Sequence, residues 1–141
     1  MYQLKSDDSV ELSDQLRTHI VTYNKQHFNA QRIPLGFKFV DKKQVVVAGI
    51  SGQVFGNWLL ISWLWCDDSV RGRGLASRLL NELESKATAL GAKMAQLDTL
   101  DFQAKPFYEK NGYQVKYQMA NYPLDGCRYF MEKSLSLKFG R

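Results

Sequence analysis

The segment CDDSVRGRGLASRLL, residues 66–80, places two arginines and two glycines just before a leucine-rich helical pattern. Glycine costs roughly 1 kcal/mol relative to alanine inside a helix, so paired glycines at this point indicate that the backbone approaches or binds a ligand. A loop that enters a helix presents several unpaired N–H groups at the positive end of the helix dipole. Gly72 and Gly74 leave room for an anion there, and Arg71 and Arg73 add positive charge. The segment therefore predicts an anion-binding loop suited to a diphosphate.

Other uses of these glycines fit the sequence less well. A dinucleotide-binding fingerprint needs a third glycine where Ser77 stands, and Asp98 supplies its acidic residue only loosely. A phosphate-binding loop of the Walker type needs Gly-Lys-Ser/Thr, which the sequence lacks. The RGRG run occurs once, inside a folded pattern, unlike the arginine-glycine tails that bind RNA. An ordinary helix N-terminus with both arginines in solvent remains as the alternative.

The patterns on both sides of this loop predict the elements that hold it. After the loop, apolar residues recur every three or four positions over residues 75–90, which predicts a helix that ends at Gly91. The next stretch, KMAQLDT (93–99), is predicted to be a strand parallel to the strand that ends at Cys66. Before the loop we expect a meander of three strands, over residues 37–41, 44–55 and 57–66.

Residues 45–66 contain no charged residue, over nearly the length of a membrane-spanning helix. Glycine, asparagine, glutamine and serine interrupt this stretch, and its apolar residues are mostly Val, Ile and Trp, which favour strands. Gly56 and Asn57 stand where a two-residue hairpin turn would fall. The stretch therefore predicts a buried antiparallel hairpin, and we expect no membrane partner.

The N-terminal region predicts a short strand over residues 1–5 and a helix over residues 10–28. Asp8 followed by Glu11 resembles a capping box at the start of this helix. Pro34 and Gly36 are expected to close the region before the meander begins.

The C-terminal third predicts one more helix and two more strands. The helix lies within DFQAKPFYEKNGY (101–113), with Asp101 as a candidate cap, Pro106 early enough to lose no hydrogen bond, and Asn111-Gly112 as a left-handed ending. The strands are expected over residues 113–119 and 127–135. Alternating helices and strands of this kind predict an α/β (α+β) fold with a mixed sheet.

The composition limits the kinds of protein that this chain can be. A chain of 141 residues with 45% hydrophobic residues suits a single domain over residues 1–141. The net charge of +5 suits an anionic partner without choosing between a nucleic acid, a phosphorylated cofactor and a membrane surface. Cys66 and Cys127 match no metal-ligand spacing and form no disulfide framework, so we expect free thiols in a reducing cytoplasm and no metal.

Two stretches, VRGRGLASRLL and LDTLDFQAKPFYEKNGYQV, together resemble the GNAT superfamily of acyl-CoA-dependent N-acetyltransferases, and CRYFMEKSL resembles the closing strand of that family. The resemblance covers residues 57–135 well and the first 56 residues only in element order. It implies a mixed, mostly antiparallel central sheet of six to seven strands with helices on both faces. The family's diphosphate-binding signature, Gln/Arg-x-x-Gly-x-Gly/Ala, maps onto Arg71, Gly72, Arg73, Gly74, Leu75 and Ala76.

The resemblance also implies acetyl-CoA as co-substrate and assigns roles to further residues. Backbone groups of Leu64, Trp65 and Cys66 are expected to contact the pantetheine arm. Asp101 stands where the family often has an asparagine that contacts this arm. Tyr108 stands where the family commonly has a tyrosine near the coenzyme sulfur, and a phenol there can donate a proton or a hydrogen bond to the leaving thiolate. Aromatic packing is the alternative role for Tyr108.

The group that accepts a proton from the acceptor amine is less clear from the sequence. Asp67, Asp68 and Asp98 are the nearest carboxylates along the chain, and each also suits a surface or capping role. His19 and His27 fall on the predicted first helix, where a packing or solvent-facing role fits better.

The expected function is that of an N-acetyltransferase that transfers the acetyl group of acetyl-CoA to a primary amine of a small molecule or a protein or peptide, by direct attack in a ternary complex. A non-catalytic acyl-CoA-binding protein is the alternative, and a basic nucleic-acid-binding domain fits less well. The acceptor pocket is expected near the first helix and Pro123. Its lining could include Trp58, Trp63 and Trp65, which alternation along a buried strand explains equally well. The sequence does not decide the oligomeric state, and a homodimer is compatible with it.

Overall fold

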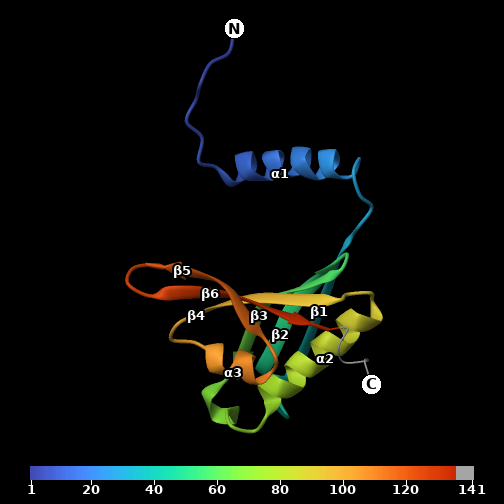
Figure 1. Cartoon of the computed structure of the whole chain (residues 1–141), viewed down its shortest axis with the longest axis vertical. Helices are drawn as coiled ribbons and strands as arrows, with labels where there is room; N and C mark the ends of the chain where they lie inside the picture. Colours follow the sequence, from blue (N-terminus) through green and yellow to red (C-terminus); the bar gives the residue numbers. More distant parts are fainter. Residues whose placement is uncertain (136–141) are drawn as a thin grey trace. The chain divides into compact units, whose positions relative to one another are not determined.

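The computed structural model describes residues 1–135 and divides the chain into two units, Met1–Ala30 and a second that begins at Gln31. The first unit carries one helix, α1 (Val10–Asn24) (Figure 1). The second carries six strands and the other helices. The expectation of one domain over residues 1–141 stays a prediction.

Three details of the first unit correct the sequence-based expectations. The cap of α1 is Ser9, whose Oγ accepts a hydrogen bond from the Leu12 N–H at 3.1 Å, and not Asp8. The helix ends at Asn24 and not at residue 28, because the chain tightens into a turn in which the Gln26 N–H bonds the Tyr23 carbonyl. Residues 1–5 form no strand, since this unit offers no second strand to pair with.

The second unit is built on a six-stranded sheet with the order β1-β2-β3-β4-β6-β5. Neighbouring strands are antiparallel except β3 and β4, which are parallel. The mixed, mostly antiparallel sheet and the parallel pair are therefore confirmed. The strands are β1 (Arg32–Val40), β2 (Val46–Phe55), β3 (Trp58–Cys66), β4 (Met94–Leu100), β5 (Gln114–Ala120) and β6 (Cys127–Ser134).

The strand β1 begins five residues before the predicted start. It includes Pro34 and Gly36, which we expected to end the N-terminal region before the first strand. A proline is tolerated here because β1 is an edge strand, so one side of its backbone needs no partner strand. This position in the sheet is a tertiary property that the local sequence does not carry.

The uncharged stretch forms the antiparallel hairpin of β2 and β3, as predicted. Gly56 takes a φ of +60° in the turn. An irregularity opposite Ser51 and Gly52 leaves Ser62 of β3 without a paired residue. Within residues 1–135, none of the helices combines the length and the apolar character needed to cross a membrane.

The helix α2 (Leu75–Ala89) packs across β1, β2 and β3, as its apolar stripe predicts. Its buried residues include Leu79, Leu80, Leu83 and Ala87. The buried carboxylate of Glu84 on the same helix accepts hydrogen bonds from the Tyr113 hydroxyl at 2.8 Å and the Lys133 ammonium at 2.9 Å. These bonds tie α2 to β6 and to the residue that precedes β5.

The helix α3 (Lys105–Lys110) is shorter than predicted. Pro106 lies in its first turn and Gly112 follows it with a φ of +95°, as expected. Asp101 does not cap this helix, because Ala104 occupies the N-cap position. The four residues between β4 and α3, residues 101–104, form a turn that connects the two elements.

Candidate active site

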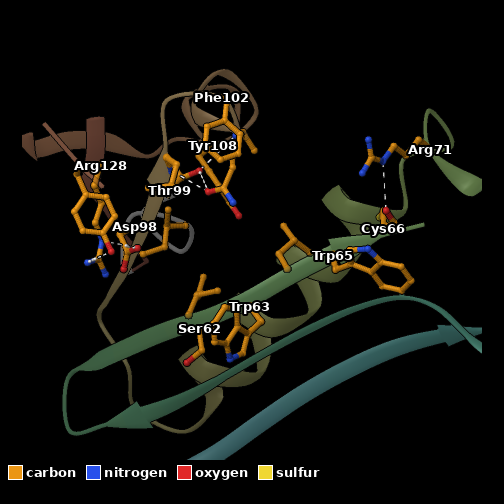
Figure 2. A pocket seen from close by; sticks show the side chains of 17 residues that line it. Ser62, Trp63, Trp65, Cys66, Arg71, Asp98, Thr99, Phe102, Tyr108 and Arg128 are labelled. Atoms are coloured by element: carbon orange, nitrogen blue, oxygen red, sulfur yellow. Dashed lines mark hydrogen bonds and ion pairs between the residues drawn. The ribbon is translucent and has the colours of Figure 1, made fainter. Parts of the chain in front are cut away.

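The two parallel strands separate after a short paired stretch. β3 and β4 pair only at Trp58–Leu60 and Met94–Gln96 in the described part of the chain. Beyond that stretch, residues 61–66 and 97–100 line opposite walls of a cavity of about 690 Å³. Figure 2 shows Trp63 and Trp65 on the β3 wall, and Asp98 and Thr99 on the other. Main-chain groups that a neighbouring strand would bond are thus left facing an open cleft.

A second cavity of about 460 Å³ adjoins the first at the N-terminal end of α2. It is lined by the loop before α2, by the first turn of α2 and by α3. The residues that line both cavities are Leu64, Cys66, Arg71, Ala104 and Tyr108. The cleft therefore continues from the separated strands to the glycine-rich loop.

The glycine-rich loop has the backbone that an anion site requires. Gly72 and Gly74 take φ values of +80° and +75°, which L side chains rarely adopt. A Cβ at either position would meet nothing within 4 Å, so the space in front of them is open. Gly74 is the N-cap of α2 and forms no side-chain cap bond. Within residues 1–135, the N–H groups of the first turn of α2 form no hydrogen bond, so they remain available as donors.

The two arginines of the loop differ in their surroundings. Arg71 donates from Nε to the Cys66 carbonyl at 3.3 Å and pairs with Asp68 at 3.0 Å, although its side chain is largely exposed. These contacts hold Arg71 at the end of β3, where it lines both cavities. Arg73 is exposed. Both arginines are thus exposed, as the alternative of an ordinary helix N-terminus expects, and only Arg71 is held beside the cleft.

Tyr108 lies at the junction of the two cavities and is 7% exposed. Its ring packs edge-on against Phe107 and Tyr113. Burial, together with the negative charge of Asp98, raises the pKa of Tyr108 to about 12. The phenol therefore keeps its proton at neutral pH and can donate a hydrogen bond into the cleft.

Of the three carboxylates considered as proton acceptors, only Asp98 lines the cleft. Its Oδ1 accepts a hydrogen bond from Arg128 Nε at 3.0 Å, and Arg128 also bonds the Tyr122 hydroxyl at 3.4 Å. Asp67 instead caps a turn, where hydrogen bonds from Ser69 hold the pKa of this carboxyl below its ordinary value.

The remaining candidates have other surroundings. Asp68 pairs with Arg71 and lines neither cavity. His19 and His27 belong to the first unit, and His27 lies beyond the end of α1. Among the described residues, no cluster of three or more metal-ligating side chains occurs.

Asp101 also lies outside the cleft lining. Its main-chain N–H bonds the Cys127 carbonyl at 3.0 Å. Its carboxylate faces Gly126, where an added Cβ would stand 3.0 Å from Oδ1. The structure therefore does not bring Asp101 together with the other predicted site residues. Residues 64–66, residues 71, 72 and 74–76, and Tyr108 surround one continuous cleft, whereas Arg73 is not part of its lining.

A family model described as "Acetyltransferase (GNAT) domain" matches residues 36–115, which is more than half of the chain. The chain belongs to the GNAT acetyltransferase family. The matched residues run from β1 to the start of β5 and include both walls of the cleft and the glycine-rich loop. The resemblance inferred from the sequence is therefore confirmed.

Individual relatives agree with this assignment to the GNAT family. A blasticidin-S acetyltransferase from Streptomyces morookaense is 35% identical over 91 residues, which cover 64% of this chain and 67% of that protein. The crystal structure of an acetyltransferase from Bacillus cereus is similar with a TM-score of 0.86 and 26% identity, over 94% of this chain and 97% of that one. An aminoglycoside 6′-N-acetyltransferase in complex with coenzyme A reaches a TM-score of 0.65 at 18% identity, over 94% and 96% of the two chains, and at that identity the likeness shows the fold alone.

The tryptophans of this GNAT protein occupy unequal positions. Trp63 is 76% exposed and Trp65 is 50% exposed, and both line the cleft. Trp58 is partly buried and does not line it. Alternation along a buried strand therefore does not explain Trp63 and Trp65. Both follow the unpaired Ser62, which interrupts the regular pairing of β3 with β2.

Sequence reasoning missed several residues of the cleft wall in this family member, and four of them have polar side chains that lie on or after β4. They are Thr99, Gln103, Tyr122 and Arg128. Thr99 and Gln103 lie close to Asp101 in the sequence, within the same stretch that resembles the family, so this stretch could have indicated them. Arg128 meets Asp98 only because β6 pairs with β4 in a register that sets Leu100 opposite Arg128, and no local pattern gives this register.

Proposed function

We propose that residues 1–141 form a cytoplasmic N-acetyltransferase domain that transfers the acetyl group of acetyl-CoA to a primary amine, by direct attack within a ternary complex. The observation that carries this proposal is the continuous cleft between β3 and β4, which joins the left-handed glycine loop to the buried phenol of Tyr108. Membership of the acetyltransferase family supports it.

The residues of the cleft fit coenzyme A. Open space in front of Gly72 and Gly74 and the uncapped first turn of α2 suit the diphosphate, with Arg71 and Arg73 adding charge. The β3 wall at Leu64, Trp65 and Cys66 suits the pantetheine arm, because an extended chain with amides can bond strand backbone that lacks a partner. Asp101 is not part of this proposal, since its carboxylate faces Gly126.

When bound, acetyl-CoA supplies an activated acetyl group, and Tyr108 acts on its sulfur. The pKa of Tyr108, about 12, lies well above the value of about 8.5 for an ordinary thiol, so full proton transfer to the thiolate is uphill by roughly 5 kcal/mol. Tyr108 therefore acts mainly as a hydrogen-bond donor that stabilises the negative charge on the departing sulfur. Orientation of the amine and the thioester in one cleft contributes a larger part, on the order of 7–11 kcal/mol.

The acceptor amine must lose a proton before or during the attack. Asp98 is suited to attract an ammonium group and to accept its proton, directly or through a water, because its carboxylate lines the cleft close enough to influence Tyr108. Arg128 of β6 holds this carboxylate in place, and it also donates a hydrogen bond to the Tyr122 hydroxyl.

We infer that the acceptor is a small molecule with a free amine, of the kind found in antibiotics. The support is the 35% identity to a blasticidin-S acetyltransferase. The two exposed tryptophans of the cleft wall also suit a flat or apolar acceptor body.

The test is thiol release from acetyl-CoA in the presence of blasticidin S, an aminoglycoside or a peptide with a free N-terminus. We expect acceptor-dependent release with a small-molecule amine, and one added acetyl group on that acceptor by mass spectrometry. The N-acetylated form of each acceptor is the matched control and should give none. Binding of acetyl-CoA without release for any amine would contradict the proposal and favour the non-catalytic acyl-CoA-binding protein.

A further inference from the structure

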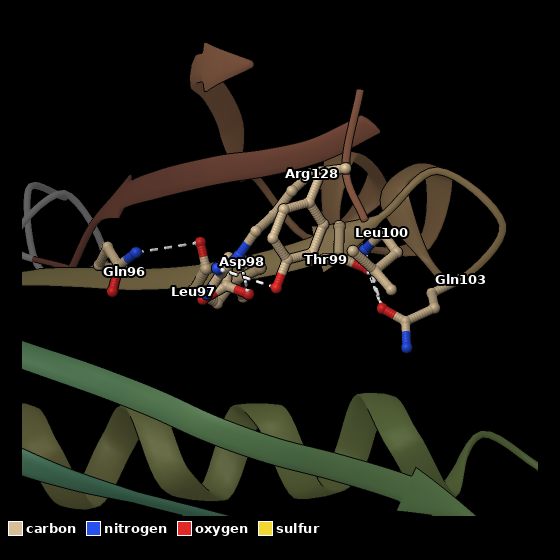
Figure 3. A network of polar contacts seen from close by, with 8 residues as sticks. Gln96, Leu97, Asp98, Thr99, Leu100, Gln103 and Arg128 are labelled. Atoms are coloured by element: carbon tan, nitrogen blue, oxygen red, sulfur yellow. Dashed lines mark hydrogen bonds and ion pairs between the residues drawn. The ribbon is translucent and has the colours of Figure 1, made fainter. Parts of the chain in front are cut away.

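An ion pair between two strands lies in the wall of the cleft. Arg128 Nε of β6 stands 3.0 Å from Asp98 Oδ1 of β4, and both residues line the cavity. The register of the two strands sets Phe130 opposite Asp98, and Arg128 lies two residues before Phe130, so the three side chains share one face of the sheet. Figure 3 shows Arg128 reaching from β6 toward Asp98. The side chains of Arg128 and Asp98 are 29% and 38% exposed, so a ligand in the cleft can reach both.

The two charged groups of this pair do not use all of their hydrogen-bonding capacity on each other. Arg128 donates from Nε to Asp98 and from Nη1 to the Tyr122 hydroxyl at 3.4 Å. Within residues 1–135, Arg128 Nη2 donates no hydrogen bond and Asp98 Oδ2 accepts none. A guanidinium has five N–H donors and a carboxylate has two acceptor oxygens. The pair therefore offers both a donor group and an acceptor oxygen to a ligand.

The guanidinium is also held by aromatic rings. Its central carbon lies 4.8 Å from the centre of the Phe130 ring and 5.1 Å from the centre of the Tyr122 ring, which are cation–π distances. An arginine fixed in this way loses little conformational freedom when it binds a ligand. A partly exposed ion pair adds only about 0–1 kcal/mol to stability, so folding alone is a weak reason for this arrangement.

The neighbouring opposite charges favour one kind of acceptor. The negative charge of Asp98 contributes to the raised pKa of Tyr108, so this carboxylate acts within the part of the cleft that holds the phenol. Arg128 weakens the attraction of Asp98 for a simple cationic amine, because the guanidinium repels an ammonium group. An acceptor that carries a negative charge beside its amine meets an opposite charge for each of its two groups.

We propose that Arg128 binds a carboxylate of the acceptor, and that the preferred acceptor is an amino-acid-like small molecule whose amine and carboxylate lie a few bonds apart. This inference rests on the proposed function and narrows its substrate class. The amine meets Asp98, and the carboxylate takes the N–H groups at the end of the guanidinium. The planar fork of an arginine suits this role because it can hold a carboxylate by two parallel hydrogen bonds.

The test compares α-amino acids with their amides, which keep the shape and the amine but lose the negative charge. Pairs with aromatic, aliphatic and charged side chains are assayed by thiol release from acetyl-CoA. The proteins are wild type, Arg128→Gln, and Lys116→Gln as the matched control. Lys116 is an exposed lysine of β5 that lines neither cavity of the cleft, so its variant loses the same charge elsewhere. A thermal unfolding scan reports whether each variant is folded.

In wild type and Lys116→Gln, kcat/KM for the preferred amino acid is expected to be about tenfold higher than for its amide, which corresponds to about 1.4 kcal/mol. This preference should vanish in Arg128→Gln. An equal loss for both acceptors in Arg128→Gln, with the preference kept, would overturn the inference, because Arg128 would then only position Asp98. Wild type that acetylates the amides equally well, or only amines without a carboxylate, would also overturn it, and this comparison needs no variant.

Failure of the proposed function gives a different result, in which wild type releases no thiol with any amine. The Kd values of the same pairs, measured by calorimetry with coenzyme A bound, then test the preference without turnover. Tighter binding of the amino acid that is lost in Arg128→Gln supports the role of Arg128. Equal Kd values for amino acid and amide contradict it.

Discussion

Replacing Gly74 by alanine is expected to raise the Kd for coenzyme A about 100-fold and to lower the free energy of unfolding by about 1–2 kcal/mol. Gly74 takes a φ of +75° at the N-cap of α2, and a side chain there is strained even though space is open around it. The loop will shift to relieve this strain, so the N–H groups of the first turn of α2 will no longer converge on one anion. Calorimetric titration measures the affinity, and urea unfolding measures the stability.

The matched control for this variant is Gly91→Ala. Gly91 lies just past the end of α2, takes a φ of +102° and also has nothing within 4 Å of an added Cβ. Its replacement should cost a similar unfolding free energy, yet leave the Kd for coenzyme A unchanged. If both variants lose affinity equally, general destabilisation and not the shape of the loop controls binding.

Replacing Tyr108 by phenylalanine is expected to lower kcat by about 100-fold with little change in the KM for acetyl-CoA. The variant removes only the hydroxyl, while the ring keeps its packing against Phe107 and Tyr113. A group that acts on the departing sulfur contributes in the transition state, so kcat falls and ground-state binding does not. Steady-state kinetics of thiol release measure both quantities, with the exposed Tyr117→Phe as the control. An unchanged kcat in Tyr108→Phe would contradict the catalytic role and show that this tyrosine serves only in packing.

The pH dependence of kcat tests whether the pKa of Tyr108 is raised in the cleft. The pKa of Tyr108 is raised to about 12, so its protonated, donating form persists as the pH rises through 10, where an ordinary tyrosine ionises. Loss of this form, and of the activity that depends on it, should begin only as the pH approaches 12. A loss near pH 10 in wild type that is absent in Tyr108→Phe would contradict the raised pKa.

Local sequence patterns predicted the parts of the site that depend on short-range chemistry. The spacing of apolar residues predicted α2, and the glycines of the loop predicted the open space that the structure has in front of Gly72 and Gly74. The uncharged stretch gave the hairpin of β2 and β3. These features depend on residues a few positions apart, which is why one sequence suffices to predict them.

Features that depend on tertiary position were missed or predicted wrongly from the sequence. The strand β1 passes through Pro34 because it lies at the edge of the sheet, and Asp98 meets Arg128 because of the register between β4 and β6. Asp101 matched a family position, yet its carboxylate lies beside Gly126 and does not line the cleft. The neighbouring turn brings Gln103 to the cleft instead, and this depends on hydrogen bonds that no spacing reveals.

The central claim is that main-chain N–H groups between Gly72 and the first turn of α2 bind the diphosphate of coenzyme A. Amide NMR spectra of the ¹⁵N-labelled protein, recorded with coenzyme A and separately with pantetheine, test it most directly. We predict large downfield shifts for the amides of residues 72–77 with coenzyme A and none there with pantetheine, which lacks phosphate. Saturating coenzyme A that leaves these amides unmoved while shifting others would contradict the account.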